Sequence, residues 1–71
     1  MKYIIKWRNI YSNEEGYVEK TSTKERCFYN TTEIGNAKAY SSEAIAKKTI
    51  RQLESFGQGS AINNEFTVIN G

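Results

Sequence analysis

The sequence predicts an α+β fold, in which a small antiparallel sheet of three to four strands packs one face against a single amphipathic helix. Three observations predict it: an alternating segment at the N-terminus, one stretch with a helical apolar period, and a β-branched run near the C-terminus. The 71 residues are enough for one domain, spanning 1–71, with a thin core. A composition of 38 % hydrophobic and 25 % charged residues is typical of a folded domain. The expected order of elements is β-β-β-α-β.

Residues 2–11 alternate between two sides, which is the period of a β-strand. The side expected to face the core carries Tyr3, Ile5 and Trp7. The other side mixes cations with apolar residues, namely Lys2, Ile4, Lys6, Arg8 and Ile10. A polar loop at 12–16, closed by a glycine, leads to a second β-rich run at 17–22, so the two strands are expected to pair antiparallel as a hairpin.

Two further strands are expected on either side of the helix. The third strand is predicted at 27–30, and 31–36 is predicted to be a loop. Residues 37–40 fit either an extended lead-in to the helix or a short edge strand, and we favour the extended segment. The last strand is predicted at 65–69. Its side directed at the helix carries Phe66 and Val68.

The clearest periodicity in the chain predicts a helix over 42–56. Ser41 is the expected N-cap, because its hydroxyl oxygen can accept a hydrogen bond from a free amide of the first turn. Glu43 places negative charge at the positive end of the helix dipole, and Gly57 is expected to close the helix. One arc of the helix carries the expected buried residues Ile45, Ala46, Thr49, Ile50, Leu53 and Phe56.

The residue types weigh against catalysis. The chain contains no His and no Asp, which removes the usual general base at neutral pH and half of the usual carboxylates. Cys27 has no His to activate it, so we interpret it as a structural, partly buried thiol. The glutamates are scattered, with Glu14 and Glu15 as the only adjacent pair, and their spacing predicts neither an acid–base pair nor a metal cage. We therefore predict no catalytic residue, no metal, no cofactor and no enzymatic activity.

The N-terminal residues 1–8 are charged too often for the apolar region of a signal peptide. No apolar run approaches the roughly 18 residues that a membrane span needs. The single cysteine cannot form an internal disulfide, which fits a reducing compartment. We therefore expect a cytoplasmic protein without a membrane partner.

Two groups of residues form the predicted interaction surface. One lies on the side of the first strand that a single helix leaves uncovered, and the other lies on the exposed side of the helix. Together they comprise Lys2, Ile4, Lys6, Arg8, Ile10, Lys47, Lys48 and Arg51. The alternative interpretation is a solvated face whose alkyl stems shield the sheet. If Tyr11, Tyr17, Ile4 and Ile10 share the uncovered face, they form an apolar patch that homodimerisation or a partner would cover.

Three stretches of the chain resemble small proteins from phages and prophages of Gram-positive bacteria. They are the start Met-Lys-Tyr-Ile-Ile-Lys, the entry into the helix Asn-Ala-Lys-Ala-Tyr-Ser-Ser-Glu-Ala at 36–44, and the ending Phe-Thr-Val-Ile at 66–69. The resemblance spans most of the chain in layout and carries over no functional residue. It implies the cytoplasm of a bacterial host and a binding role, because small accessory phage products often bind a host protein or nucleic acid.

The leading hypothesis is a non-enzymatic, phage-type accessory protein. It would bind an unidentified host or phage protein, or a second copy of itself, through its open sheet face or its charged helix face. The alternative is a small nucleic-acid-binding module that uses Lys2, Lys6, Arg8, Lys47, Lys48 and Arg51. A net charge of +2 is lower than such modules usually carry, and no helix-turn-helix, zinc-finger or RNP motif is present.

Overall fold

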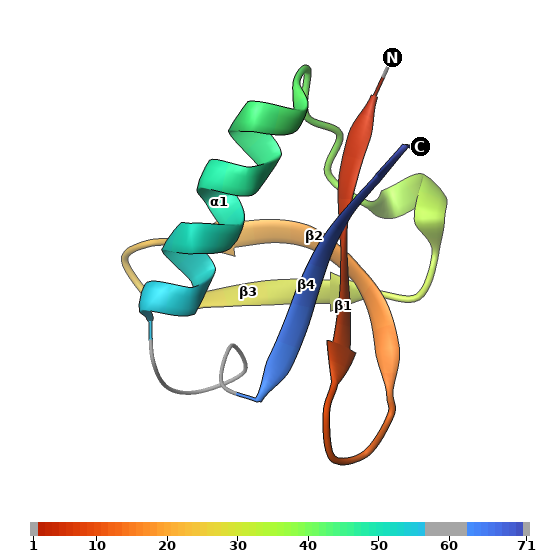
Figure 1. Cartoon of the computed structure of the whole chain (residues 1–71), viewed down its shortest axis with the longest axis vertical. Coiled ribbons are helices and arrows are strands. Elements are labelled where there is room, and N and C mark those ends of the chain that lie inside the picture. Colours follow the sequence, from red (N-terminus) through yellow and green to blue (C-terminus); the bar gives the residue numbers. More distant parts are fainter. Residues whose placement is uncertain (1, 57–62, 71) are drawn as a thin grey trace.

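The computed structural model describes residues 2–56 and 63–70. Its elements follow the order β1 (Tyr3–Asn9), β2 (Glu15–Ser22), β3 (Cys27–Thr31), the 3₁₀ turn η1 (Ile34–Asn36), α1 (Glu43–Ser55) and β4 (Asn64–Asn70). The strands form one antiparallel sheet in the order β3-β2-β1-β4, and α1 packs across one face of it (Figure 1). The predicted α+β fold is therefore confirmed. Within the described ranges, no helix is long and apolar enough to cross a membrane.

β1 and β2 pair antiparallel, as predicted, but the turn between them begins earlier, at Ile10. The Asn9 side chain accepts hydrogen bonds from the amides of Tyr11 and Ser12, each at 2.9 Å, and Asn residues stabilise many turns in this way. Asn13 adopts a left-handed conformation with φ of 62°, and its amide donates to the Asn9 carbonyl at 3.0 Å. Ile10 therefore lies in the turn and not on the strand.

The sheet is strongly curved, and the second half of β2 runs crosswise to β1 and β4 (Figure 1). The pairing of β2 with β3 shifts register between Val18 and Lys20, and such a bulge bends a strand and increases its twist. The bend brings Phe28 of β3 into the core. Its ring centroid lies 6.1 Å from that of Trp7 and 5.5 Å from that of Phe66.

The core lies between the curved sheet and α1. Its largest fully buried side chains are Ile5, Val18 and Leu53, which come from β1, β2 and α1. The other buried members are Phe28, Tyr40, Ala46 and Phe56. Half-buried side chains that pack against them are Tyr3, Trp7, Ile50, Phe66 and Val68. The predicted core-facing sides of the first and last strands are thus confirmed.

α1 begins one residue later than predicted, because Ser42 and not Ser41 is its N-cap. The Ser42 hydroxyl oxygen accepts a hydrogen bond from the Ile45 amide at 3.2 Å. Ile45 is 48 % exposed, so its predicted place among the buried residues is wrong. It lies at the border of the apolar arc, about 80° around the helix axis from the fully buried Leu53, and so turns away from the core. The closure expected at Gly57 lies outside the described residues.

The segment after β3 partly covers the sheet face opposite α1. Tyr40 exchanges two backbone hydrogen bonds with Tyr3, at 2.7 and 3.0 Å, and the Lys38 amide donates to the Val18 carbonyl at 3.0 Å. The segment 37–40 is thus not a strand, as the favoured interpretation has it, but it joins the sheet through one β-bridge and one further backbone hydrogen bond. η1 and the residues after it border a hollow beside Ile4.

Candidate functional site

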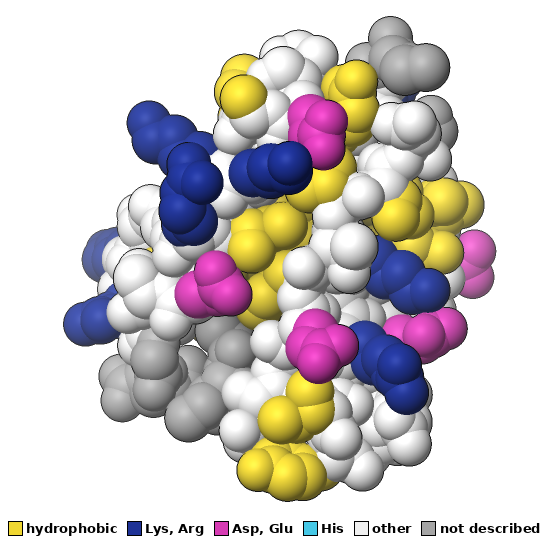
Figure 2. Space-filling view, in the orientation of Figure 1, with side chains coloured by type: hydrophobic (Ala, Val, Ile, Leu, Met, Phe, Trp, Pro, Cys, Tyr) yellow, Lys and Arg dark blue, Asp and Glu magenta, His cyan; other side chains and the backbone are white. Residues whose placement is uncertain are grey.

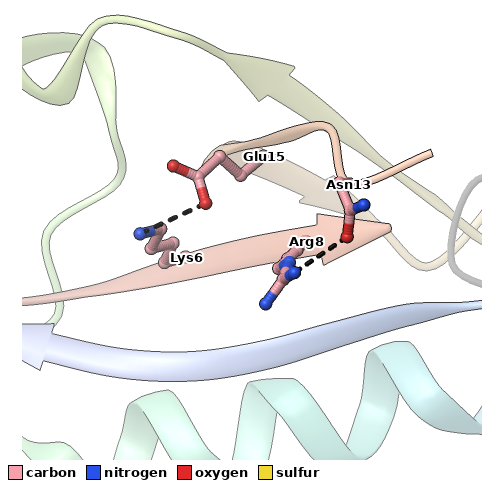
Figure 3. A network of polar contacts seen from close by, with 4 residues as sticks. All are labelled: Lys6, Arg8, Asn13 and Glu15. Carbon is pink, nitrogen blue, oxygen red and sulfur yellow. Dashed lines mark hydrogen bonds and ion pairs between the residues drawn. The ribbon is translucent and has the colours of Figure 1, made fainter. Parts of the chain in front are cut away.

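The two cations of β1 each have a polar partner in the β1–β2 hairpin (Figure 3). Lys6 Nζ lies 3.6 Å from Glu15 Oε2, and Arg8 Nη2 donates to Asn13 Oδ1 at 2.8 Å. Arg8 also lies opposite a glutamate on each neighbouring strand, Glu15 on β2 and Glu65 on β4. Two glutamates therefore lie beside Lys6 and Arg8 and offset the positive charge of this part of the predicted basic face.

The apolar residues predicted for the same surface do not lie on it together. Ile4 is 3 % exposed, so its predicted place on an uncovered sheet face is wrong. It is buried because η1 and the residues after it, which include Ile34 and Ala37, close over this end of the sheet. Ile10 is 48 % exposed but lies in the turn. Lys2 is exposed at the border of the hollow beside Ile4.

The apolar patch expected from Tyr11, Tyr17, Ile4 and Ile10 does not form. Tyr11 is 76 % exposed at the tip of the β1–β2 turn, beside Ile10 in the sequence. Tyr17 is half-buried on β2, opposite Lys6 of β1. With Ile4 buried and Tyr17 half-buried, the four side chains do not form one exposed apolar patch.

The helix cations are exposed, as predicted, and cationic side chains gather over α1 in Figure 2. Lys47 Nζ lies 3.2 Å from Glu43 Oε1, one turn earlier. Such an exposed pair contributes less than about 1 kcal/mol to the stability of the fold, so Lys47 can also bind another anion. Arg51 has no ion-pair partner within residues 2–56 and 63–70. Lys48 lies toward the other flank of the helix, beside Ile45.

An open groove with a volume of about 450 Å³ lies between α1 and β4. Its floor is apolar and consists of Ile50 from α1 with Phe66 and Val68 from β4, all half-buried. An apolar band is visible between the helix cations and β4 in Figure 2. The helix side of the groove is charged and carries Glu43, Lys47 and Arg51. A smaller hollow continues the groove toward the end of β4, beside Tyr3, Glu43, Val68 and Asn70.

β4 is an edge strand, and its free side faces away from β1. The Ile10 amide donates to the Asn63 carbonyl at 2.9 Å, and hydrogen-bonded positions alternate along an antiparallel pair. Counting from Asn63 along the register of β1 and β4, the amide and carbonyl of Thr67 point toward β1. Those of Phe66 and Val68 point toward the free edge. No described segment pairs with this edge. Backbone donors and acceptors are therefore open beside the apolar floor.

The described residues bring together little else that carries chemistry. No three His, Cys, Asp or Glu side chains lie close enough there to hold a metal ion. Cys27 is half-buried on β3, at the opposite side of the sheet from β4. A hydrogen bond to the Glu25 carboxylate at 2.8 Å raises the pKa of Tyr29, and burial raises the pKa of Tyr40. Neither tyrosine borders the groove.

Comparison of the chain with family models, with curated proteins and with solved structures gave no match. The groove is therefore interpreted from its own geometry. Sequence reasoning identified its cations, Lys47 and Arg51, but assigned Ile50, Phe66 and Val68 to the core. These three side chains pack against the core with one side and border the groove with the other. The missing information was the position of the last strand at a sheet edge.

Proposed function

We propose that the protein binds an extended segment of a partner protein, which adds to β4 as a fifth strand and lies in the groove along α1. The free edge of β4 carries this proposal, because the backbone groups of Phe66 and Val68 are open there. An added strand would pair with these groups while its side chains cover the apolar floor, as in other cases of strand addition. The proposal keeps the predicted protein-binding role. Of the two predicted surfaces, the open sheet face and the charged helix face, it takes the second together with its groove.

β4 lacks the features that usually protect a sheet edge. Natural edge strands are often short or carry lysines, prolines or bulges that prevent pairing with another chain. β4 has seven residues, contains no Pro or Lys, and carries one charged residue, Glu65. β3, at the other edge of the sheet, has five residues. β4 is therefore the longer edge and the one that offers a groove for the side chains of an added strand.

A partner protein fits this edge better than a second copy of the chain. In a two-fold dimer formed by two β4 strands, each helix meets the same face of the other helix. The two helices would run antiparallel across the axis, which places Glu43 of one copy toward Arg51 of the other, so charge does not oppose this arrangement. A second copy is disfavoured for another reason. The helix-facing side chains of its β4, Phe66 and Val68, already pack against its own core, so they are not free to cover the groove floor of the first copy.

The wider role belongs to the same proposal. The resemblance to phage and prophage proteins supports a non-enzymatic accessory protein in the cytoplasm of a bacterial host. Nucleic-acid binding has less support, because Lys6 and Arg8 already have polar partners in the β1–β2 hairpin and the net charge is only +2. Phosphate contacts are strongest at low salt, so a low-salt buffer is the most favourable condition for nucleic-acid binding. We expect no measurable binding to a short DNA or RNA duplex in such a buffer.

Hydrogen exchange tests the strand addition directly. The probe is a peptide selected with the wild-type protein from a displayed library of random sequences. The Phe66 and Val68 amides point to the free edge, so they should exchange rapidly in the free protein and slowly with the peptide bound. The Thr67 amide faces β1 and serves as an internal control that is protected in both states. Selected peptides that leave the exchange at Phe66 and Val68 unchanged would refute the proposal, as would a library that yields no binder.

A matched pair of substitutions locates the binding surface. Ile50→Lys places a cation on the groove floor and should weaken peptide binding by about tenfold or more, since apolar contacts are lost. Ile45→Lys makes the same change at an exposed position on the other flank of α1 and should leave the affinity unchanged. Circular dichroism verifies that both variants are folded. Equal affinities for the two variants would contradict the proposed site.

Self-association is tested in the same protein without peptide. Sedimentation should give a monomer at concentrations where the Phe66 and Val68 amides still exchange rapidly. A dimer in which these amides are protected would show that a second copy fills the groove, and the proposal of a separate partner would then be wrong.

A further inference from the structure

The charges along the groove are unevenly distributed. α1 and β4 run in opposite directions, so the N-terminal end of α1 lies beside the C-terminal end of β4 (Figure 1). Glu43 accordingly borders the hollow next to Val68 and Asn70. Arg51, two turns further along α1, lies toward the Phe66 end. The groove therefore has an acidic end and a basic end.

The two ends differ in how far their charges are compensated. Glu43 is paired with Lys47 at 3.2 Å. Arg51 has no carboxylate partner in the described part of the chain, although its guanidinium group can bind a carboxylate with two parallel hydrogen bonds. The basic end is thus the place where a ligand carboxylate gains most.

We infer that the segment bound by the groove carries an acidic side chain two residues after an apolar one, an inference that rests on the proposed function. A segment antiparallel to β4 runs from the Glu43 end to the Arg51 end. Its alternate side chains face α1 and advance about 7 Å per pair of residues, close to the roughly 6 Å between Lys47 and Arg51 along the helix. The first such side chain lies beside Val68 and is apolar, and the next lies beside Phe66, where its carboxylate meets Arg51.

Selection with charge variants tests this pattern. The same displayed library of random peptides is selected with the wild-type protein, with Arg51→Glu and with Lys48→Glu. The last two variants carry the same charge change on the same helix. Arg51 borders both the groove and the hollow on the other flank, whereas Lys48 borders only that hollow, beside Ile45. We expect Asp or Glu to be enriched two positions after an apolar residue with wild type and Lys48→Glu. With Arg51→Glu, we expect Lys or Arg at that position.

Binding measurements on one selected peptide complete the test. Replacing its acidic residue by Gln or Asn should weaken binding to wild type by about tenfold and leave binding to Arg51→Glu unchanged or stronger. Groove binders without acidic enrichment, or with enrichment that Arg51→Glu does not alter, would refute the inference while the proposed strand addition stands. Peptides that do not protect the Phe66 and Val68 amides would instead refute the strand addition itself.

Discussion

Ile4 and Ile10 lie on the same side of the alternating N-terminal segment but differ sharply in exposure, at 3 % and 48 %. Truncating a fully buried isoleucine to alanine usually costs about 2 to 5 kcal/mol, because it removes apolar contacts and leaves a cavity. We expect Ile4→Ala to lower the free energy of unfolding by that amount and Ile10→Ala to lower it by less than about 1 kcal/mol. Urea denaturation of both variants measures the difference. Similar losses for the two would mean that the cover over Ile4 is absent in solution.

These two residues also show what an alternating pattern predicts and what it omits. The pattern placed Tyr3, Ile5 and Trp7 correctly on the face that packs against α1. It could not place Ile4, because the cover over Ile4 comes from residues 34–39, about thirty positions further along the chain. A period of two identifies two faces of a strand, but burial of the second face depends on contacts from distant segments.

Tyr40 makes the stability of the fold sensitive to alkaline pH, because the fold loses stability when this side chain ionises. Burial raises the pKa of its hydroxyl, and the neighbouring Thr49 hydroxyl lowers it by less. The folded state therefore holds this proton more tightly than the unfolded state. The resulting stability is complete below the ordinary tyrosine pKa of about 10 and is lost as pH rises through the higher folded-state value.

Tyr40→Phe should remove this dependence. The variant should be about as stable as wild type at pH 7, because the Tyr40 hydroxyl is buried without a well-formed hydrogen bond in the described part of the chain. Between about pH 9 and pH 11 its stability should fall less steeply than that of wild type. Urea midpoints at several pH values measure both effects. Tyr11→Phe, at an exposed turn residue, is the control, and an equal slope for the two variants would exclude Tyr40 as the source.

At the scale of elements, two adjacent serines at the start of α1 offer a sharp comparison. Only Ser42 accepts the capping hydrogen bond, from the Ile45 amide, while Ser41 is exposed one residue earlier. Loss of an N-cap hydroxyl typically costs about 1 kcal/mol. Ser42→Ala should therefore lower the thermal midpoint by several degrees, and Ser41→Ala should leave it nearly unchanged. The reverse order would show that the helix begins one residue earlier, as the sequence predicts.

The elements themselves were predictable, and their arrangement was only partly so. Local period and turn residues identified every strand and α1 to within two or three residues of their ends, because these signals lie within each segment. The β1–β2 hairpin followed from a short loop. The order of all four strands depends instead on the pairing of β1 with β4, which are more than fifty residues apart. The groove was therefore not predictable, since it exists only because β4 is an edge.

At the scale of the whole molecule, one thin core joins all elements, so the helix and the sheet should unfold together. Leu53 of α1 is fully buried against Ile5 and Val18 of the sheet. For 71 residues, the typical free energy of unfolding is roughly 4 to 10 kcal/mol. Leu53→Ala, at about 2 to 5 kcal/mol, would thus remove a large part of it.

The single tryptophan makes this cooperativity measurable, because Trp7 reports on β1 while far-ultraviolet circular dichroism reports chiefly on α1. In urea, both signals should change in one coincident transition for wild type, and at the same lower midpoint for Leu53→Ala. Ile45→Ala, an exposed change on the same helix, should shift neither signal appreciably. If the helix signal of Leu53→Ala were lost before the Trp7 signal, the sheet would be stable without α1. The groove between α1 and β4 would then form and open independently of the core.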